Sequence, residues 1–238
     1  MPMTGPTVRT SKPPLQGRST PPALRCFPQL PGMDLWRGQR IGLLGGSFNP
    51  AHEGHLHISL EAIKRLGLDH VWWLVSPQNP LKSSKDMAPL QDRLRYARSL
   101  VRHPRIHVSD IEQRLGTTYT ANTLERLKSL LPNSRLIWLM GADNLQQFPH
   151  WNRWTDIVAS VPLAVFDRNH YSLRGLTGKM ATRFRHSRLS VQAAKALATK
   201  TAPAWVFIPL RRHPASATEI REAQIANSPF SVAVKPKE

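Results

Sequence analysis

Short apolar runs alternate with stretches of helical periodicity between about residue 40 and residue 210. Each run has three to five apolar residues bounded by Gly, Pro or charged residues, a pattern that predicts a strand buried on both faces. The expected strands are Ile41–Leu44, Val71–Val75, Ile106–Val108, Leu136–Met140, Leu163–Phe166 and Trp205–Ile208.

The stretches between these runs place apolar residues three and four positions apart, as one face of a helix requires. The expected helices are Gly54–Leu66, Leu90–Val101, Thr120–Leu131, Trp154–Ser160 and Thr218–Ala226, with a basic segment around Ser190–Ala198 before the last of them. This alternation predicts an α/β fold, a Rossmann-like doubly wound parallel sheet in a single domain. Ligands of such sheets bind at the carboxyl ends of the strands.

Composition narrows the class of protein. One cysteine cannot form an internal disulfide, which points to a reducing compartment, and we expect a cytoplasmic location. No apolar run approaches the roughly 20 residues that cross a bilayer, so we expect no membrane partner. The 33 Lys and Arg against 15 Asp and Glu give a net charge of +18, which raises nucleic acid as a partner.

The charge is uneven along the chain. Residues 1–33 hold no acid and eight of the 21 prolines, so we expect residues 1–38 to be a disordered basic, Pro-rich extension. We expect a folded domain at 39–228 and a tail at 229–238. A second acid-free stretch, Arg168–His213, holds ten Lys and Arg. It fits either nucleic acid or a site that attracts polyanionic nucleotides.

The segment richest in candidate chemistry follows the first expected strand, where residues 45–55 read GGSFNPAHEGH. Gly45 and Gly46 lack a Cβ, so we expect the backbone to leave the strand there and approach a ligand closely. Pro50 fixes the turn, and Gly54 opens a helix whose N–H groups and dipole favour an anion. The sequence therefore predicts a phosphate site at this junction.

Two histidines three residues apart, His52 and His55, face the same expected ligand, where they would donate hydrogen bonds to phosphate oxygens. The alternative is a metal site made by His52, His55 and His57, because helical spacing permits it. No nearby cysteine completes such a site and Glu53 is expected to point elsewhere, so we favour phosphate and predict no protein-held metal.

The pattern Gly-Gly-x-Phe-x-Pro-x-His-x-Gly-His in this segment resembles the HxGH nucleotidyltransferase superfamily. Ser216–Arg221 resembles the superfamily's second motif, a hydroxyl-rich helix start that ends on a basic residue. Gly141–Trp154 resembles the corresponding segment of bacterial nicotinate-nucleotide adenylyltransferases, and Thr118–Leu124 and Pro80–Lys82 fall at that family's expected places. The resemblance covers roughly residues 40–227.

The resemblance implies a role for each motif residue. The implied catalytic residues, which contact phosphates, are His52, His55 and Arg221. The implied ATP-binding residues are Gly45, Gly46, Ser47, Phe48, Gly54, Lys82, Gly141, Asp143, Ser216 and Thr218. The implied nicotinate mononucleotide-binding residues are Asn49, Thr118, Tyr119, Thr120, Trp151 and Asn152. Without the resemblance, Tyr119 and Trp151 would be read as core aromatics and Asp143 as a capping residue.

Two departures from the family pattern affect this transfer. Ala217 stands where the family often has serine, and Lys82 lacks the preceding histidine that many relatives carry.

The implied reaction joins nicotinate mononucleotide to the adenylyl group of ATP and releases pyrophosphate. A phosphate nucleophile is already ionised at neutral pH, which agrees with a site that has cationic donors and no Ser–His or Cys–His pair. Mg²⁺ would enter with ATP, held by phosphate oxygens and water. Three alternatives stay open: use of nicotinamide mononucleotide, another HxGH-type adenylyltransferase, or a basic nucleic-acid-binding protein. No motif supports specific nucleic-acid binding, and the sequence leaves a homo-oligomer possible.

Overall fold

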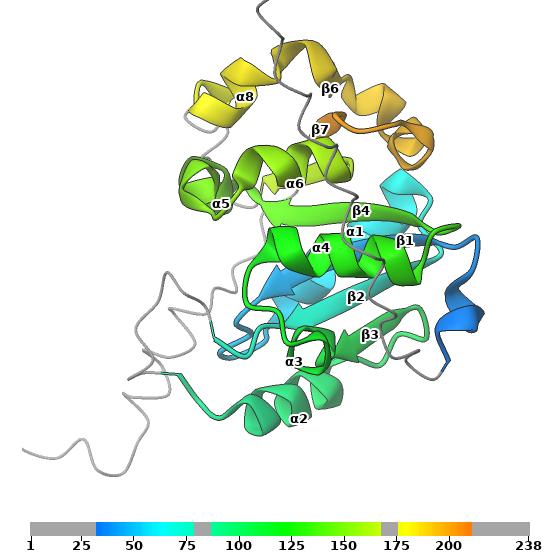
Figure 1. Ribbon diagram of the computed structural model, residues 1–238, viewed down its shortest axis with the longest axis vertical. Coiled ribbons are helices and arrows are strands. Elements are labelled where there is room, and N and C mark those ends of the chain that lie inside the picture. Colours follow the sequence, from blue (N-terminus) through cyan, green and yellow to red (C-terminus); the bar gives the residue numbers. More distant parts are fainter. Residues whose placement is uncertain (1–31, 79–86, 168–175, 211–238) are drawn as a thin grey trace, which may run out of the picture. The chain divides into compact units, whose positions relative to one another are not determined.

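Seven parallel strands form one sheet in the order β3-β2-β1-β4-β5-β7-β6 (Figure 1). The computed structural model describes residues 32–78, 87–167 and 176–210. The strands are β1 (Arg40–Gly46), β2 (His70–Val75), β3 (Ile106–Ser109), β4 (Arg135–Gly141), β5 (Leu163–Asp167), β6 (Arg188–Leu189) and β7 (Trp205–Pro209). All six apolar runs are strands, which confirms the predicted parallel sheet. The edge strand β6 has only two residues, too few to form an apolar run from which it could be predicted.

The longer helices also lie where the periodicity placed them. They are α1 (Glu53–Leu66), α2 (Leu90–Leu100), α4 (Thr120–Leu130) and α6 (Trp154–Ser160). Elements that the periodicity did not predict are η1 (Met33–Trp36), α3 (Ile111–Leu115), α5 (Ala142–Gln147), η2 (Phe148–His150), α8 (Lys179–Arg183) and η3 (Arg185–Ser187). The basic segment forms the 3-10 helix η4 (Val191–Thr199). The expected helix Thr218–Ala226 lies outside the described residues.

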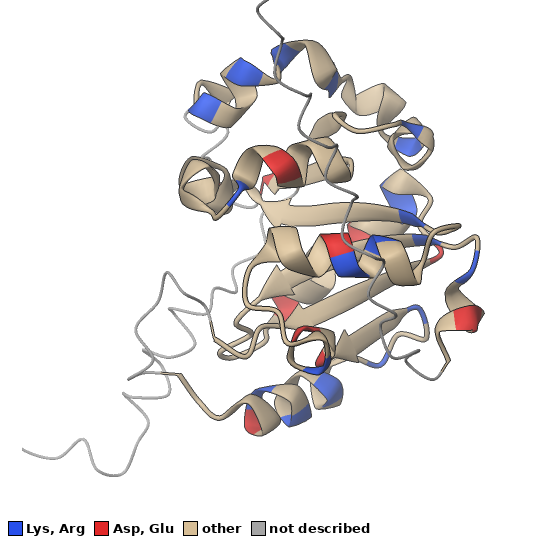
Figure 2. Ribbon diagram, viewed as in Figure 1, with Lys and Arg blue, Asp and Glu red and all other residues tan. Residues whose placement is uncertain are grey.

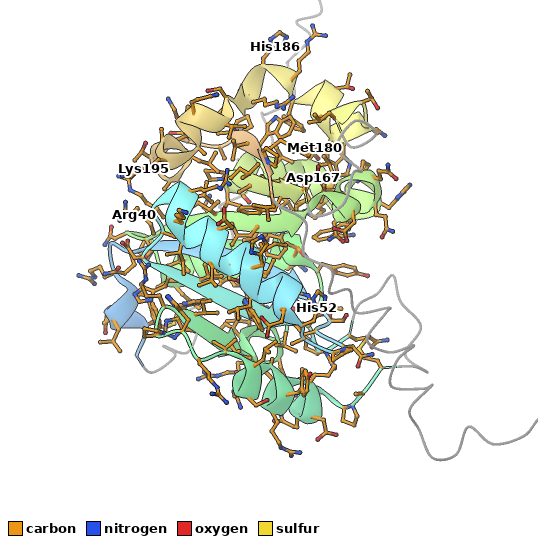
Figure 3. All side chains as sticks on the ribbon, turned by 180° about the vertical axis from the view of Figure 1, so that it is seen from behind. Arg40, His52, Asp167, Met180, His186 and Lys195 are labelled. Atoms are coloured by element: carbon orange, nitrogen blue, oxygen red, sulfur yellow. The ribbon has the colours of Figure 1, made fainter. Side chains whose placement is uncertain are left out.

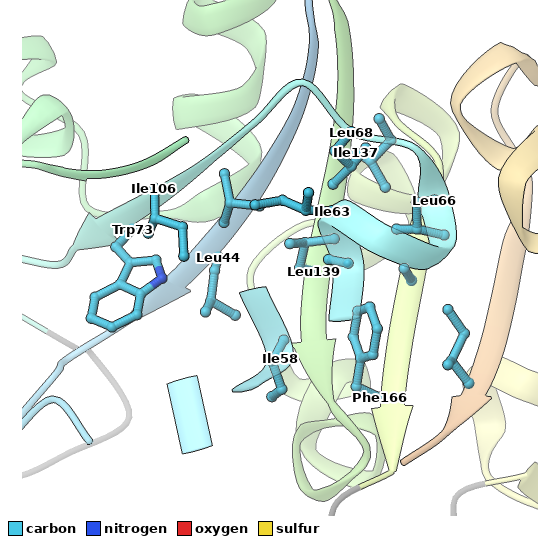
Figure 4. Close-up of a cluster of buried hydrophobic side chains, with 14 of the residues drawn as sticks. Leu44, Ile58, Ile63, Leu66, Leu68, Trp73, Ile106, Ile137, Leu139 and Phe166 are labelled. Atoms are coloured by element: carbon cyan, nitrogen blue, oxygen red, sulfur yellow. The ribbon is translucent and has the colours of Figure 1, made fainter. Parts of the chain in front are cut away.

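Helices cover both faces of the sheet, as a doubly wound fold requires. Helices α1, α2 and η4 pack on one face, while α4 and α6 pack together on the other (Figure 1). The core on the α1 face contains Leu44, Ile58, Trp73, Leu139 and Phe166, all nearly inaccessible to solvent (Figure 4). Burying one such side chain contributes about 1.5–3 kcal/mol. Because these strands are buried on both faces, their sequences are almost continuously apolar.

The order of the strands reverses between β1 and β4, which are neighbours in the sheet although β2 and β3 separate them in the chain. Their register pairs Leu43 with Trp138 and Leu44 with Leu139. A reversal of this kind opens a crevice at the carboxyl ends of the two strands, where ligands of such folds bind. The segments Gly45–His55 and Gly141–Trp154 begin at the carboxyl ends of these two strands, so the fold brings both motifs to the place where such ligands are expected.

At the opposite end of the strands, η1 packs against the starts of β2 and β3. Trp36 packs edge-on against His70 and His107, at centroid distances of 5.0 and 4.9 Å. Arg40 at the start of β1 forms a two-point ion pair with Asp69, and Figure 3 shows Arg40 and His52 at opposite ends of the sheet. We expected the extension to run to residue 38, but residues 33–36 are an ordered turn on the sheet; residues 1–31 and the expected tail at 229–238 lie outside the described residues.

Candidate active site

The glycine pair lies within β1, which runs through Gly46. The expectation that the backbone leaves the strand at these glycines was therefore wrong. A Cβ on Gly45 would stand 2.4 Å from Cη2 of Trp138 on the neighbouring strand, so glycine is required there by packing. A Cβ on Gly46 would meet only the ring of Phe48, at 3.4 Å or more, which is ordinary contact.

An aromatic stack follows directly after the strand. Phe48 has a φ of 46°, which turns its ring into the core, where it is 1% exposed. The ring stacks on Trp73 of β2 with centroids 5.0 Å apart and lies 4.7 Å from the ring of His55. Trp73 Nε1 donates to Ser59 Oγ at 2.7 Å, and Ser59 Oγ donates to the carbonyl of His55 at 2.8 Å. The position of His55 is thus set by contacts on both its ring and its backbone.

The two motif histidines start helix α1 as a reciprocal capping box. His52 is the N-cap, and its Nδ1 accepts a hydrogen bond from the backbone N–H of Gly54 at 3.1 Å. In return, His55 Nδ1 accepts from the backbone N–H of His52 at 3.2 Å. Serine or threonine with glutamate usually fills these places. An Nδ1 that accepts cannot carry the proton, so in the neutral ring the proton is on Nε2. Both imidazoles therefore present Nε2–H as a donor.

The Nδ1 atoms of His52 and His55 are engaged with backbone N–H groups, so a metal ion at these two side chains would have to bind through Nε2. Within the described ranges, no group of three or more His, Cys, Asp or Glu side chains is placed to hold a metal ion.

The second motif begins where β4 ends. Gly141 is the N-cap of α5 and Asp143 is exposed in the first turn of that helix. Farther along, Trp151 is half-buried, with its ring 5.2 Å from Phe148 and 6.1 Å from Trp138. Trp151 is thus neither a core residue nor a free surface residue, since one side of the ring packs while part of it faces solvent.

The third segment, Thr118–Thr120, precedes and begins α4. Tyr119 is the N-cap residue of α4 and its side chain is 42% exposed, so it is not a core aromatic. Thr118 is exposed and Thr120 is half-buried. Because α4 starts at the edge of the sheet where the parallel strands end, the Tyr119 segment lies at the same edge as the β1–α1 junction and the Asp143 turn (Figure 1).

A buried cluster of polar side chains, Glu112, Thr117 and Thr123, lies beside the Tyr119 segment. Glu112 accepts from Thr123 Oγ1 at 3.2 Å, and the hydroxyls of Thr123 and Thr117 lie 2.8 Å apart. Burial raises the pKa of Glu112 to about 7, while hydrogen bonds from Thr123 and Ser76 lower it in part. Glu112 belongs to none of the motifs found in the sequence.

One arginine joins the second and third segments. Arg153 donates to Glu125 on α4 at 2.5 Å, to Asn122 on α4 at 3.3 Å and to Asp156 on α6 at 2.8 Å. These bonds hold the turn that follows Trp151 against the helix that follows Tyr119. Tyr119 and Trp151, the two aromatic residues expected to bind nicotinate mononucleotide, are therefore carried by linked elements.

A buried arginine supports the first segment, and the sequence analysis did not select it either. Arg93 on α2 is 3% exposed and donates to the carbonyls of Ser47, Ser76, Pro77 and Ala88. Its position three residues after Leu90 and four before Ala97 places it on the apolar face of the helix, which is the signal that could have identified it.

The acid-free stretch is partly described, at residues 176–210. Six Lys and Arg with no Asp or Glu fall in this range, and Figure 2 shows the cations along α8, η3 and η4. Arg183 lies 5.8 Å over the ring of Trp154, and Arg188 lies 5.3 Å over Trp205. This surface raises the positive potential of the domain.

Comparisons with known proteins assign the chain to a family. A family model described as cytidylyltransferase-like matches residues 43–223. A probable nicotinate-nucleotide adenylyltransferase of Parvibaculum lavamentivorans is 54% identical over 188 residues, which are 79% of this chain and 94% of that protein. One of Rhizobium johnstonii is 49% identical over 185 residues, 78% of this chain and 93% of that protein. The chain belongs to the nicotinate-nucleotide adenylyltransferase family.

The fold of a solved adenylyltransferase agrees with this assignment. A Plasmodium falciparum nicotinic acid mononucleotide adenylyltransferase complexed with NaAD has a TM-score of 0.57 and 17% identity, covering 77% of this chain and 83% of that one. At this identity the likeness concerns the fold alone. No helix within the described ranges is long and apolar enough to cross a membrane.

The site of this nicotinate-nucleotide adenylyltransferase is described in part. The structure brings residues 45–55, 118–120 and 141–152 to one edge of the sheet. Four residues expected in the site, Lys82, Ser216, Thr218 and Arg221, lie outside the described residues.

Proposed function

We propose that this nicotinate-nucleotide adenylyltransferase binds ATP at the β1–α1 junction and nicotinate mononucleotide between the Tyr119 and Trp151 segments, and joins them at the β1/β4 crevice. An oxygen of the mononucleotide 5′-phosphate forms a bond to the α-phosphorus of ATP. The bond from that phosphorus to the bridging oxygen breaks, and pyrophosphate leaves with the electron pair. The observation that carries the proposal is the capping box at the β1–α1 junction, in which the Nδ1 atoms of His52 and His55 both accept backbone N–H groups.

The ATP half of the site combines donors of two kinds. The Nε2–H groups of His52 and His55 donate to phosphate oxygens, and the N-terminus of α1, at Gly54, adds backbone N–H groups and a favourable dipole. Asp143 accepts a hydrogen bond from a ribose hydroxyl. The backbone at Gly45, Gly46, Ser47, Phe48 and Gly141 lines this half, and Lys82, Ser216, Thr218 and Arg221 complete the phosphate contacts.

The mononucleotide half is built for a flat, charged ring. Tyr119 and Trp151 flank the pyridine in this proposal, which is supported by the partial exposure of both aromatic residues. Backbone N–H groups near Thr118, Thr120 and Asn152 pair with the carboxylate, and Asn49 contacts the phosphate end.

Catalysis in this scheme requires no general base. The attacking phosphate is ionised at neutral pH, so the protein accelerates the reaction by aligning two anions and stabilising charge in the transition state. ATP is used as its Mg²⁺ complex, in which phosphate oxygens and water hold the ion.

Substrate choice tests the proposal directly. Pyrophosphate release from ATP is measured with nicotinate mononucleotide and with nicotinamide mononucleotide. We expect kcat/KM to favour the acid by at least about 100-fold, since donors placed for a carboxylate are left unpaired by the amide. Equal kcat/KM values would contradict the assignment of the pyridine site.

Capping-box variants separate chemistry from folding. His55→Gln and His52→Asn keep side-chain acceptors of the kind usual at N3 and N-cap, so helix α1 should still start at Glu53. In each variant the amide oxygen takes over the capping bond of Nδ1, so the amide N–H no longer occupies the position of the imidazole Nε2–H. We expect kcat to fall about 100- to 1000-fold with a small change in Tm.

The matched control for these variants is His103→Asn. The Nδ1 of His103 also accepts a backbone N–H, from Arg105 at 3.2 Å, but His103 lies before β3, away from the crevice. We expect this variant to keep wild-type kcat. If His55→Gln were as active as His103→Asn, the phosphate site would be wrong.

A further inference from the structure

Four backbone carbonyls surround the buried guanidinium of Arg93. Nη1 donates to the carbonyls of Ser47 at 2.6 Å and Ser76 at 2.8 Å, and Nη2 donates to Pro77 at 3.0 Å. Nε donates to Ala88 at 2.8 Å. One side chain therefore joins the segments that follow two neighbouring strands, β1 and β2, to the start of α2.

The charge of Arg93 is balanced in an unusual way. No carboxylate of the described residues forms an ion pair with it, and burial lowers its pKa, although an arginine stays protonated at any physiological pH. Burying a charge is unfavourable, and an apolar side chain would usually serve a core better. Carbonyl dipoles take the place of a counter-ion, and removing the cation would leave these carbonyls without their donor. The arrangement thus favours fixed loop geometry over packing.

The carbonyl of Ser47 stands immediately before the strained residue of the loop. Phe48 has a φ of 46°, a conformation that is an outlier for a bulky side chain and persists only where the surroundings hold it. Because the peptide unit is planar, fixing the Ser47 carbonyl toward Arg93 also fixes the direction of the Phe48 N–H. The Phe48 ring in turn lies against the His55 ring, at 4.7 Å.

A second contact closes the same frame. The backbone N–H of Ala88, whose carbonyl Arg93 binds, donates to the Asn49 side chain at 3.2 Å. The N–H of Ser76 donates to the carbonyl of Gly46 at 2.9 Å. The loop from Gly46 to Asn49 is therefore held at Ser47 by Arg93 itself. It is held at Gly46 and at Asn49 by the backbone N–H groups of Ser76 and Ala88, whose carbonyls Arg93 also binds.

We propose that Arg93 is a positioning residue of the reaction: by binding the carbonyls of Ser47, Ser76 and Pro77 it holds Phe48 in its left-handed conformation and thereby sets the ring of His55. Arg93 donates all its hydrogen bonds in this frame to the chain and acts on the substrate only through His55. The inference deepens the proposed function and rests on the role given there to His55.

The test compares Arg93→Lys and Arg93→Gln with the matched pair Arg95→Lys and Arg95→Gln. Arg95 is on the same helix, with an exposed side chain that pairs with Asp92. We expect the Arg93 variants to lose about 10- to 100-fold in kcat, because a displacement near 1 Å costs up to about 100-fold. KM for ATP should change less than about threefold, and the Arg95 variants should keep wild-type kcat. All assays are run well below each variant's Tm.

A double-variant cycle with His55 distinguishes positioning from simple stability. If Arg93 acts through His55, Arg93→Gln should reduce kcat by less than about threefold in the His55→Gln background, where the positioned group is already absent. A purely structural arginine would cost the same factor in both backgrounds. The proposal would be overturned if Arg93→Gln lowered kcat by the same factor in the wild-type and His55→Gln backgrounds. It would also be overturned if both folded Arg93 variants kept wild-type kcat.

Hydrogen exchange tests the positioning role of Arg93 independently of enzymatic activity. We expect amides at 48–49 and 78 to exchange at least about tenfold faster in Arg93→Lys, with the strands β1 and β4 unchanged. If the wild-type protein released no pyrophosphate, the proposed function would fail, and the exchange result would still decide whether Arg93 orders the loop. Unchanged exchange at 48–49 in a folded variant would overturn the positioning role by itself.

Discussion

Replacing Gly45 with alanine should destabilise the protein although the change adds only one methyl group. The new Cβ would lie 2.4 Å from Cη2 and 2.8 Å from Cζ2 of Trp138. Carbon atoms in contact prefer about 3.5–4.0 Å, so at least one of the two strands or the indole ring has to move by about 1 Å. The neighbouring glycine supplies the control, because a Cβ on Gly46 has no contact shorter than 3.4 Å.

The magnitude follows from how firmly the indole is held. Trp138 is 1% exposed and its ring packs edge-on against Trp151. Overpacking a site of this kind costs about 1–3 kcal/mol. For a domain of about 150–250 residues each kcal/mol corresponds to roughly 2–4 °C, so we expect Gly45→Ala to lower Tm by about 2–12 °C. Gly46→Ala should leave Tm unchanged or raise it slightly, because alanine restricts the unfolded chain.

The assay is thermal and urea unfolding of both variants beside the wild type. The double variant Gly45→Ala with Trp138→Phe adds a direct check, because the smaller ring makes room for the methyl group. We expect its loss of stability to be smaller than the sum of the two single losses by about 1–2 kcal/mol. A Tm for Gly45→Ala equal to that of Gly46→Ala would refute the argument that the indole fixes this glycine.

Three further predictions concern stability. Glu112→Gln should stabilise the protein at pH 8 by up to about 3 kcal/mol and change its stability little at pH 4.5. The reason is that the pKa of Glu112 is raised from 4.5 to about 7, so the stability from its bound proton is lost as pH rises through 7. Equal effects at both pH values would contradict this. Burial lowers the pKa of His70 and of His107, so the stability they contribute is present above about pH 6.5 and lost as pH falls toward their folded-state pKa values. Replacing both with asparagine should flatten the slope of unfolding free energy between pH 7 and pH 5.5, and an unchanged slope would exclude the pair as its source. Ser59→Ala should cost about 1–3 kcal/mol in urea unfolding because Trp73 Nε1 loses its acceptor; an unchanged urea midpoint would mean that the indole finds another.

The sheet could be predicted from the sequence because its strands are buried on both faces. Such strands have no polar alternation, so apolar runs such as Val71–Val75 mark them to within one or two residues. Helices α3, α5 and α8 have five or six residues each. That is less than two turns, too short to establish a helical period.

The candidate site was predictable where a motif names its residues and not where burial assigns the role. The positions of His52 and His55 came from their spacing, but their reciprocal capping through Nδ1 depends on ring orientations that no sequence pattern specifies. At Gly45 the motif predicts contact with a ligand, and the structure adds a packing requirement from Trp138, which lies on a neighbouring strand and is remote in sequence. Arg93 was overlooked because a charged residue on a helix usually points to water, although its spacing from Leu90 placed it on the buried face.

The pairing of Leu43 with Trp138 has a consequence for the distance between the two substrates. The residues proposed to bind the two substrates lie after β1 and after β4, so the hydrogen-bond ladder between these strands sets the distance between those two segments. The register of this ladder can shift only in steps of one residue, about 3.3 Å, which is as long as the approach distance of two reacting atoms. A slip of one position would therefore abolish the reaction outright, and substitutions that strain this ladder far from any ligand should be recognised first as kinetic defects.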